Sequence, residues 1–200
     1  NSAGNEALTH YRASFTDQDE DGLHEFSPEE ELLAIYEAEY VEVYLLWDDV
    51  WTAAAEDYEL YIVDDEGEIL AASENPQDGT EGQTPAEWVA LSTDTSQVYA
   101  MVKAYDADRV VTFDLFTKGP GVEVAHPVPA YSVLTPADAM HALTVGAVNW
   151  DDDRIAKYSS QGPTNDERLK PEISGPTGVS GETYGDEGFN GTSASAPHVA

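Results

Sequence analysis

A run of small residues near the end of the printed sequence constrains the fold more than any other feature. The stretch GFNGTSASAPHVA, residues 188–200, surrounds a Thr-Ser pair with Gly, Ala and Ser and then continues into Pro-His-Val. Glycine lets the backbone turn tightly, small side chains let a helix approach its neighbours, and proline is tolerated in the first helical turn. The stretch therefore predicts a tight turn that leads into a closely packed helix beginning near Thr192 or Ser193.

The place of Ser193 in this turn suits two roles. At a junction between a loop and a helix, free backbone N–H groups and the positive end of the helix dipole favour a developing negative charge, so a serine there can be a nucleophile. A serine or threonine before an Ala-rich helix is also the usual N-cap residue. From the residues alone, both interpretations of Ser193 stay open.

The segment NGTSASAPHVA resembles the nucleophile motif of the subtilisin family of serine proteases. It follows the family's Gly-Thr-Ser-x-x-x-Pro-His-Val-Ala run position by position, which implies that Ser193 is the nucleophile of a serine endopeptidase acting on peptide or protein substrates. NSAGNEA, at residues 1–7, is similar to the family's Ala-Gly-Asn segment, and residues 142–181 resemble the family's strand and loop sequence before the nucleophile. The resemblance implies that Asn5 is the oxyanion-hole donor. It also implies a wall of the specificity pocket formed by Ser2, Ala3 and Gly4.

The family's mechanism requires two further residues. A serine nucleophile needs a histidine base and an aspartate that orients it, and in this family both precede the serine along the chain. We expect them upstream of Asn1, so that this chain is the C-terminal portion of a catalytic domain and is inactive by itself. The motif makes His198 a structural residue that follows Pro197. No segment like the family's histidine motif surrounds His10, His24, His126 or His141.

Two other functional classes stay open. If the upstream residues are substituted, the protein is a pseudoprotease or a binding module acting through its inserted domain. In the second class, this chain is only a structural fragment, whatever the longer protein does.

More than a hundred residues separate the segments that resemble subtilisin, and their pattern predicts β-strands. Apolar and polar residues alternate over residues 41–47, as in a strand with one buried face. YELYIV at 58–63 and the following EILAA predict a hairpin. QVYAMVKAY and RVVTFDLF predict a second pair of strands joined across residues 106–108. Together these strands predict a small antiparallel β-sandwich.

We therefore predict an α/β subtilisin-like catalytic fold, partial and built on a parallel sheet, with an inserted antiparallel β-sandwich. The predicted divisions are residues 1–10, a catalytic strand with the oxyanion Asn; 11–35, an acidic linker; 36–118, the sandwich; and 119–200, the catalytic part with the nucleophile.

The role of the sandwich stays open between stabilisation and substrate positioning. The stretch LLWDDVWTAAAEDYELYIVDDEG is similar to strand pairs in β-sandwich modules that accompany many secreted proteases. Carbohydrate binding is the weaker alternative, because it would need aromatic side chains such as Tyr36, Tyr58 and Trp88 exposed on one face.

The composition indicates where such a protein works. Forty Asp and Glu stand against eight Lys and Arg, which gives a net charge of −32, yet 41% of the residues are hydrophobic. This combination predicts a folded protein from a high-salt environment, where ions screen the self-repulsion. Like charge disfavours nucleic acid and anionic membranes as partners. The chain has no cysteine, and the family resemblance implies secretion to the cell exterior.

The acidic stretch FTDQDEDGLHEF begins like a calcium-binding loop. Asp17, Asp19 and Asp21 alternate before a glycine, and Glu25 stands at the ninth position. Alternate carboxylates of this kind can converge on one cation. The twelfth position is Pro28, where a calcium loop of this type needs a bidentate Glu. The peptidase needs no cofactor, so calcium at these four residues is a separate hypothesis, and a solvated acidic turn is its alternative.

Overall fold

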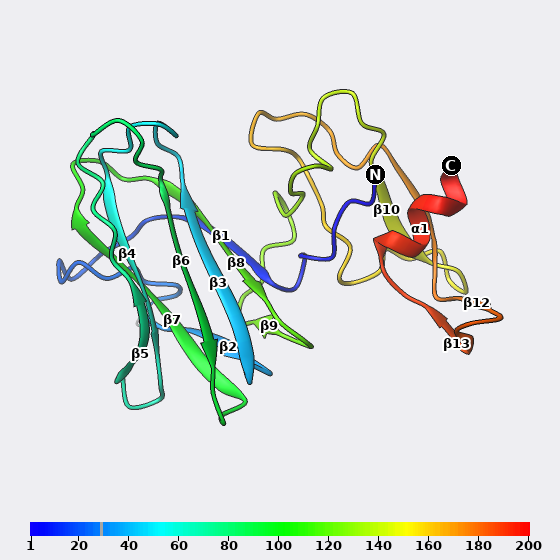
Figure 1. The fold of residues 1–200 in the computed structure, drawn as a ribbon, viewed down its shortest axis with the longest axis horizontal. Helices are drawn as coiled ribbons and strands as arrows, with labels where there is room; N and C mark the ends of the chain where they lie inside the picture. Colours follow the sequence, from blue (N-terminus) through cyan, green and yellow to red (C-terminus); the bar gives the residue numbers. More distant parts are fainter. Residues whose placement is uncertain (29) are drawn as a thin grey trace. The chain divides into compact units, whose positions relative to one another are not determined.

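Figure 1 shows the computed structural model of the protein, which describes residues 1–28 and 30–200. The chain forms two compact units. We call residues 1–10 with 127–200 the terminal unit, and residues 11–126 the inserted unit. Over the described ranges, no helix has both the length and the apolar character needed to span a membrane.

Two antiparallel sheets make up the inserted unit. Among the described residues, one sheet has the strand order β1 (His10–Ser14), β8 (Thr112–Lys118), β3 (Tyr40–Trp47) and β6 (Ala86–Ser92). The other has the order β5 (Ile69–Ser73), β4 (Asp57–Val63), β7 (Gln97–Asp106), β2 (Leu33–Tyr36) and β9 (Glu123–Val124). The unit therefore extends beyond residues 36–118 at both ends, and the stretch predicted as an acidic linker contains strands of both sheets.

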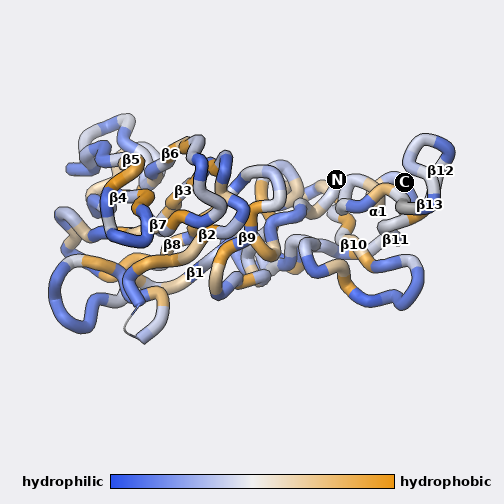
Figure 2. The backbone as a smooth tube through the Cα atoms, turned by 90° about the horizontal axis from the view of Figure 1, so that it is seen from below, coloured by the Kyte–Doolittle hydropathy of each residue, from blue (hydrophilic) through white to orange (hydrophobic). Residues whose placement is uncertain are grey.

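The alternation predicted for residues 41–47 is confirmed in β3. Val41, Val43 and Leu45 are fully buried, and Trp47 is 4% exposed, whereas the residues between them are partly accessible. Burying each of these side chains contributes roughly 1.5–3 kcal/mol of apolar transfer free energy. Figure 2 shows hydrophobic colour concentrated on the strands and hydrophilic colour in the turns between them.

The pairing of the strands was predicted only in part. The hairpin of β4 and β5 is confirmed, with Leu60 opposite Ser73. The predicted pairing of β7 with β8 is wrong, because β7 pairs with β2 and β4 in one sheet while β8 pairs with β3 in the other. The chain crosses between the two sheets over residues 107–111. Alternation identifies a strand with one buried face, but it does not identify the strand's partner.

The terminal unit contains parallel strand pairing. Strand β10 (Val145–Asn149) pairs in parallel with β11 (Ile173–Thr177), and Ser2 forms a parallel bridge to Val145 on the other side. Strands β12 (Val179–Gly181) and β13 (Gly185–Phe189) form an antiparallel hairpin. The α/β prediction is thus confirmed only in part, because most of the described strands are antiparallel and lie in the inserted unit.

Helix α1 (Thr192–Val199) begins where the sequence predicts and packs on β11. A Cβ atom on Gly175 would lie 2.6 Å from the carbonyl oxygen of Ser195, so only glycine permits this approach. Pro197 lies in the second turn of the helix and not in the first, because the helix already begins at Thr192. The sequence argument that placed Pro197 in the first turn was therefore wrong by one turn.

The two segments of the terminal unit meet where the inserted unit begins and ends. The backbone N–H of Val128 donates to the carbonyl oxygen of His10 at 2.8 Å. The Nδ1 atom of His10 lies 2.6 Å from the carbonyl oxygen of Val128. The chain thus leaves and re-enters the terminal unit at one pair of hydrogen-bonded residues.

Candidate active site

Ser193 is the second residue of α1, and its side chain is exposed. The residue before the helix is Gly191, which has a φ of 123° and provides no side-chain cap. This φ lies in a region that side-chain-bearing residues rarely adopt, so the turn requires glycine. The N-cap interpretation of Ser193 is wrong, because the serine lies inside the first helical turn.

Asn5 is fixed by the residue that precedes Ser193. Its Oδ1 atom accepts hydrogen bonds from the backbone N–H of Thr192 at 3.0 Å and from the Thr192 hydroxyl at 3.1 Å. The same hydroxyl accepts a hydrogen bond from the backbone N–H of Gly4 at 3.1 Å. Two donors on Oδ1 determine which branch of the amide is oxygen. The Nδ2 atom therefore occupies the other branch.

Asn5 Nδ2 and the backbone nitrogen of Ser193 lie near the same space, and neither donates a hydrogen bond to another described residue. The position that a Cβ atom on Gly191 would take lies 3.5 Å from Asn5 Nδ2 and 3.8 Å from the backbone nitrogen of Ser193. This space adjoins a hollow of about 200 Å³ lined by Asn5, Tyr158, Asn190 and Gly191. Two convergent donors beside an exposed serine can stabilise an oxygen atom that becomes negatively charged.

The turn at Gly191 is held by Tyr158 and Thr177, two residues that the sequence analysis missed. The backbone N–H of Gly191 donates to the Tyr158 hydroxyl at 2.8 Å and to Thr177 Oγ1 at 3.0 Å. The two hydroxyl oxygens lie 2.8 Å apart. Thr177 is the last residue of β11, and its side chain is buried.

No described histidine side chain forms a hydrogen bond with Ser193. His198 Nδ1 lies 2.7 Å from the carbonyl oxygen of Ala194, which agrees with its structural assignment. His24 is fully buried among aromatic rings, and burial lowers its pKa to about 4. His10 is also fully buried and contacts the backbone of Val128, His126 contacts Glu30, and His141 is exposed.

The predicted wall of the specificity pocket runs beside β10. Ala3 is fully buried and donates its N–H to the carbonyl oxygen of Val145 at 2.9 Å, while Ser2 and Gly4 are half-buried. These three residues bring Asn5 next to Thr192. Their contact with substrate stays a prediction.

The acidic loop brings three of its predicted ligands together. One carboxylate oxygen from each of Asp17, Asp19 and Asp21 lies within 4.8 Å of the others. Glu25 Oε1 accepts the backbone N–H of Gln18 at 2.6 Å. Glu25 Oε2 is buried and has no hydrogen-bond partner among the described residues. Glu25 lies outside the group of three aspartates, and its unpartnered buried oxygen is of the kind that a hard cation binds.

Comparisons with known proteins match the part of the chain that contains Ser193 to a peptidase family. Residues 117–200 match the model of the Subtilase family, whose members are serine peptidases. Bacillopeptidase F of Bacillus subtilis (strain 168) is 34% identical over 105 residues, which is 50% of this chain and 7% of that protein.

A solved structure shares the fold. The CspB protease of Clostridium perfringens matches with a TM-score of 0.65 and 16% identity, over 99% of this chain and 46% of that one. The chain thus spans less than half of the solved structure and under a tenth of the curated relative.

Proposed function

We propose that this chain supplies the nucleophile and the oxyanion donor of a serine endopeptidase that hydrolyses peptide bonds in proteins. The observation that carries the proposal is that Asn5 Nδ2 and the Ser193 backbone nitrogen lie 3.5 Å and 3.8 Å from one position, in the turn that leads to an exposed serine. Serine peptidases of this family need an aspartate and a histidine as well. The proposal therefore concerns a polypeptide that carries all three triad residues.

In that polypeptide, Ser193 Oγ attacks the carbonyl carbon of the scissile peptide and transfers its proton to the histidine. The carbonyl oxygen becomes an oxyanion, which accepts hydrogen bonds from Asn5 Nδ2 and the Ser193 N–H. The C–N bond then breaks as the histidine returns the proton to the leaving amine, which leaves an acyl group on Ser193. Water attacks the acyl-enzyme and releases the acid. Thr192 keeps Nδ2 aimed at the oxyanion by occupying Oδ1.

Fluorophosphonate labelling separates this function from its alternative. The complete polypeptide should be labelled at Ser193, and the 200-residue chain should not. A folded complete polypeptide that resists labelling would indicate a pseudoprotease and would move the function to the inserted unit.

We also propose that the acidic loop binds calcium through Asp17, Asp19, Asp21 and Glu25. Calorimetric titration of the chain should show one binding event, and Asp19→Asn should weaken it by about tenfold or more because one charged ligand is lost. Asp19 is the suitable position, since the carboxylates of Asp17 and Asp21 accept backbone hydrogen bonds of the turn. Asp151→Asn, on an exposed loop of the terminal unit, is the control. No heat, or heat unchanged by Asp19→Asn, would contradict a site.

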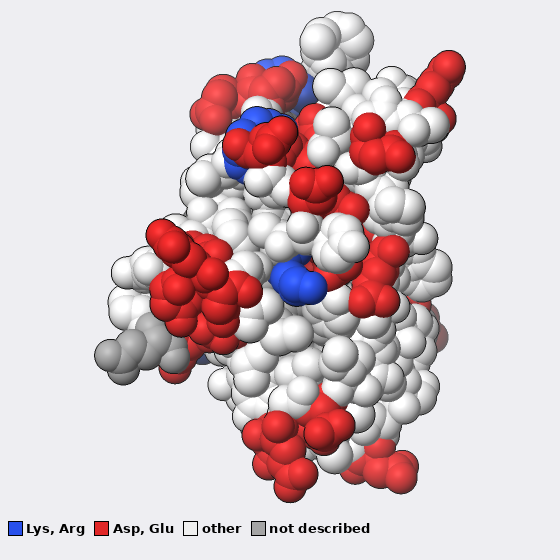
Figure 3. Space-filling model, turned by 90° about the vertical axis from the view of Figure 1, so that its left-hand side faces the viewer, with Lys and Arg blue, Asp and Glu red and all other residues white. Residues whose placement is uncertain are grey.

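A third proposal concerns the environment: we infer that the protein is secreted and works in high salt. Eight basic residues cannot neutralise forty acidic ones, and Figure 3 shows carboxylates gathered in several groups on one face. Withdrawing KCl from molar to millimolar should lower Tm by about 10 °C or more, because screening of this repulsion is lost. The measurement is made with a chelator throughout, so that calcium loss is not the cause. A constant Tm would refute the inference.

A further inference from the structure

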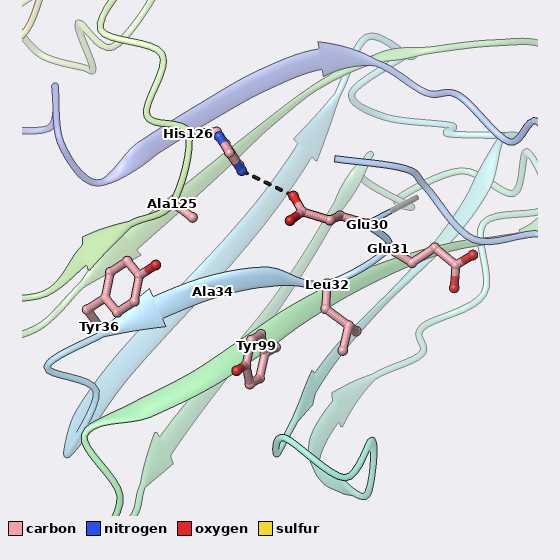
Figure 4. Close-up of a pocket in the computed structure, with 8 residues that line it drawn as sticks. All are labelled: Glu30, Glu31, Leu32, Ala34, Tyr36, Tyr99, Ala125 and His126. Atoms are coloured by element: carbon pink, nitrogen blue, oxygen red, sulfur yellow. Dashed lines mark hydrogen bonds and ion pairs between the residues drawn. The ribbon is translucent and has the colours of Figure 1, made fainter. Parts of the chain in front are cut away.

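Two adjoining hollows lie on the five-stranded sheet of the inserted unit, and they share Tyr99. The first has a volume of about 570 Å³, and the residues around it include Glu30, Glu31, Tyr36 and His126 (Figure 4). The second has a volume of about 420 Å³. Its lining includes Asp65, Asp94, Gln97 and Tyr99. Tyr99 borders both hollows, and we call the two hollows together the tyrosine groove.

The aromatic part of the tyrosine groove comes from two neighbouring strands. Tyr36 on β2 pairs with Gln97 on β7, and Ala34 pairs with Tyr99. Tyr36 and Tyr99 are therefore diagonal neighbours on the same face of the sheet. Tyr36 is 43% exposed, and the Tyr99 hydroxyl accepts a hydrogen bond from Gln97 Nε2 at 2.7 Å. The Tyr36 ring is therefore partly exposed, and a hydrogen bond fixes the position of the Tyr99 hydroxyl.

Carboxylates line both hollows of the tyrosine groove. Glu30 and Glu31 line the first hollow, Asp65 and Asp94 line the second, and the described lining of neither contains lysine or arginine. Glu31 also lies close to the acidic loop. Partial desolvation, and then the carboxylates of Asp21, Asp19, Glu25 and Asp17, raise the pKa of Glu31.

We propose that the tyrosine groove binds an extended peptide segment that carries arginine or lysine side chains. A cationic side chain gains from the face of an aromatic ring, and it gains again from a carboxylate within reach. The groove offers both kinds of group, with two carboxylates in the lining of each hollow and Tyr99 in the lining of both. The ligand is therefore a basic stretch of a protein or peptide.

Carbohydrate fits the face less well. A sugar-binding sheet presents several exposed rings side by side, but Tyr58 is 2% exposed and Trp88 lies on β6 of the other sheet. The three aromatic residues named in the sequence analysis therefore do not form one exposed face: Tyr36 is exposed on one sheet, Trp88 is exposed on the other, and Tyr58 is buried. An anionic polymer would be repelled by the four carboxylates.

Binding can be measured on the 200-residue chain, so the result does not depend on the proposed peptidase activity. The probe is a fluorescent, capped tetra-arginine peptide, and its control is the tetra-citrulline peptide, which has nearly the same shape without charge. Anisotropy is read in the lowest salt at which circular dichroism shows the chain folded. We expect the arginine peptide to bind and the citrulline peptide to bind at least about tenfold more weakly.

A matched pair of double variants separates the groove from the general charge of the surface. Glu31→Gln with Asp94→Asn removes one carboxylate from each hollow, and we expect Kd to rise about tenfold. Asp151→Asn with Glu182→Gln removes the same two residue types at exposed positions of the terminal unit, and it should change Kd less than about twofold.

The contribution of the Tyr36 ring is tested with a matched pair of single variants. Tyr36→Ala should raise Kd about threefold, whereas Trp88→Ala, at an exposed residue of the other sheet, should not.

Three outcomes would overturn the proposal. Equal losses in both double variants would mean that the acidic surface attracts cations without a site. Tight binding of the citrulline peptide would remove the role of charge. Binding of a neutral hexasaccharide that is lost in Tyr36→Ala would assign the groove to carbohydrate. Should a variant not fold, NMR shift changes in the unaltered chain still decide, because shifts that avoid Tyr36, Tyr99 and their neighbours would refute the site.

Discussion

Replacing Ser193 with alanine should lower kcat for peptide hydrolysis by roughly 10⁶-fold in the polypeptide that carries the whole triad, as removal of the nucleophile does in subtilisin. The reason is chemical, since alanine has no oxygen to form the acyl intermediate. The residual rate would come from the oxyanion donors and substrate binding alone. Fluorophosphonate labelling followed by mass spectrometry checks the same point, because the alanine variant should take up no label.

The chain provides a matched control two residues further along α1. Ser195 is fully buried, and its hydroxyl has no hydrogen-bond partner among the described residues. Ser195→Ala removes the same atom from the same helix, so it should keep both labelling and turnover. A Ser193→Ala variant that still hydrolyses peptides, or still takes up label, would show that another residue is the nucleophile.

Asn5→Ala should lower kcat by roughly 100- to 1000-fold with little change in KM. Asn5 Nδ2 donates to the oxygen only once that oxygen carries negative charge, so its loss raises the barrier more than it weakens substrate binding. Steady-state kinetics with a peptide substrate give the two parameters separately.

Asn5→Asp separates catalysis from folding at the same position. An aspartate can still accept both hydrogen bonds from Thr192, but it presents an oxygen where Asn5 presents Nδ2. We expect Asn5→Asp to keep the Tm of the unaltered protein and to lose at least as much kcat as Asn5→Ala. A kcat near that of the unaltered protein in Asn5→Asp would refute the role of Nδ2.

The sequence was most informative where a short motif and its local geometry coincide. Small residues around Ser193 predict both the turn and the start of α1, and the structure has both. The motif also links Asn5 to Ser193 across 187 residues, and the structure places both next to Thr192. A motif carries this long-range information, whereas the spacing of residue types alone does not.

What the sequence missed depends on tertiary placement. Tyr158 and Thr177 support Gly191 only because β11 and the loop before it come together beneath the turn. The periodicity of residue types along the chain does not indicate that these two segments come together. The pairing of β7 with β8 was mispredicted for a related reason, since neighbouring strands of a sandwich can belong to opposite sheets.

His10 and Val128 are hydrogen-bonded to each other, so the inserted unit between them is a loop whose two ends are held together in the terminal unit. If more than a hundred residues between them were disordered, closing that loop would cost about 4 kcal/mol of chain entropy, in addition to a constant term. A folded insertion has already lost most of that freedom. Unfolding the sandwich would therefore loosen the position of Asn5 against Ser193 through the connectivity of the chain.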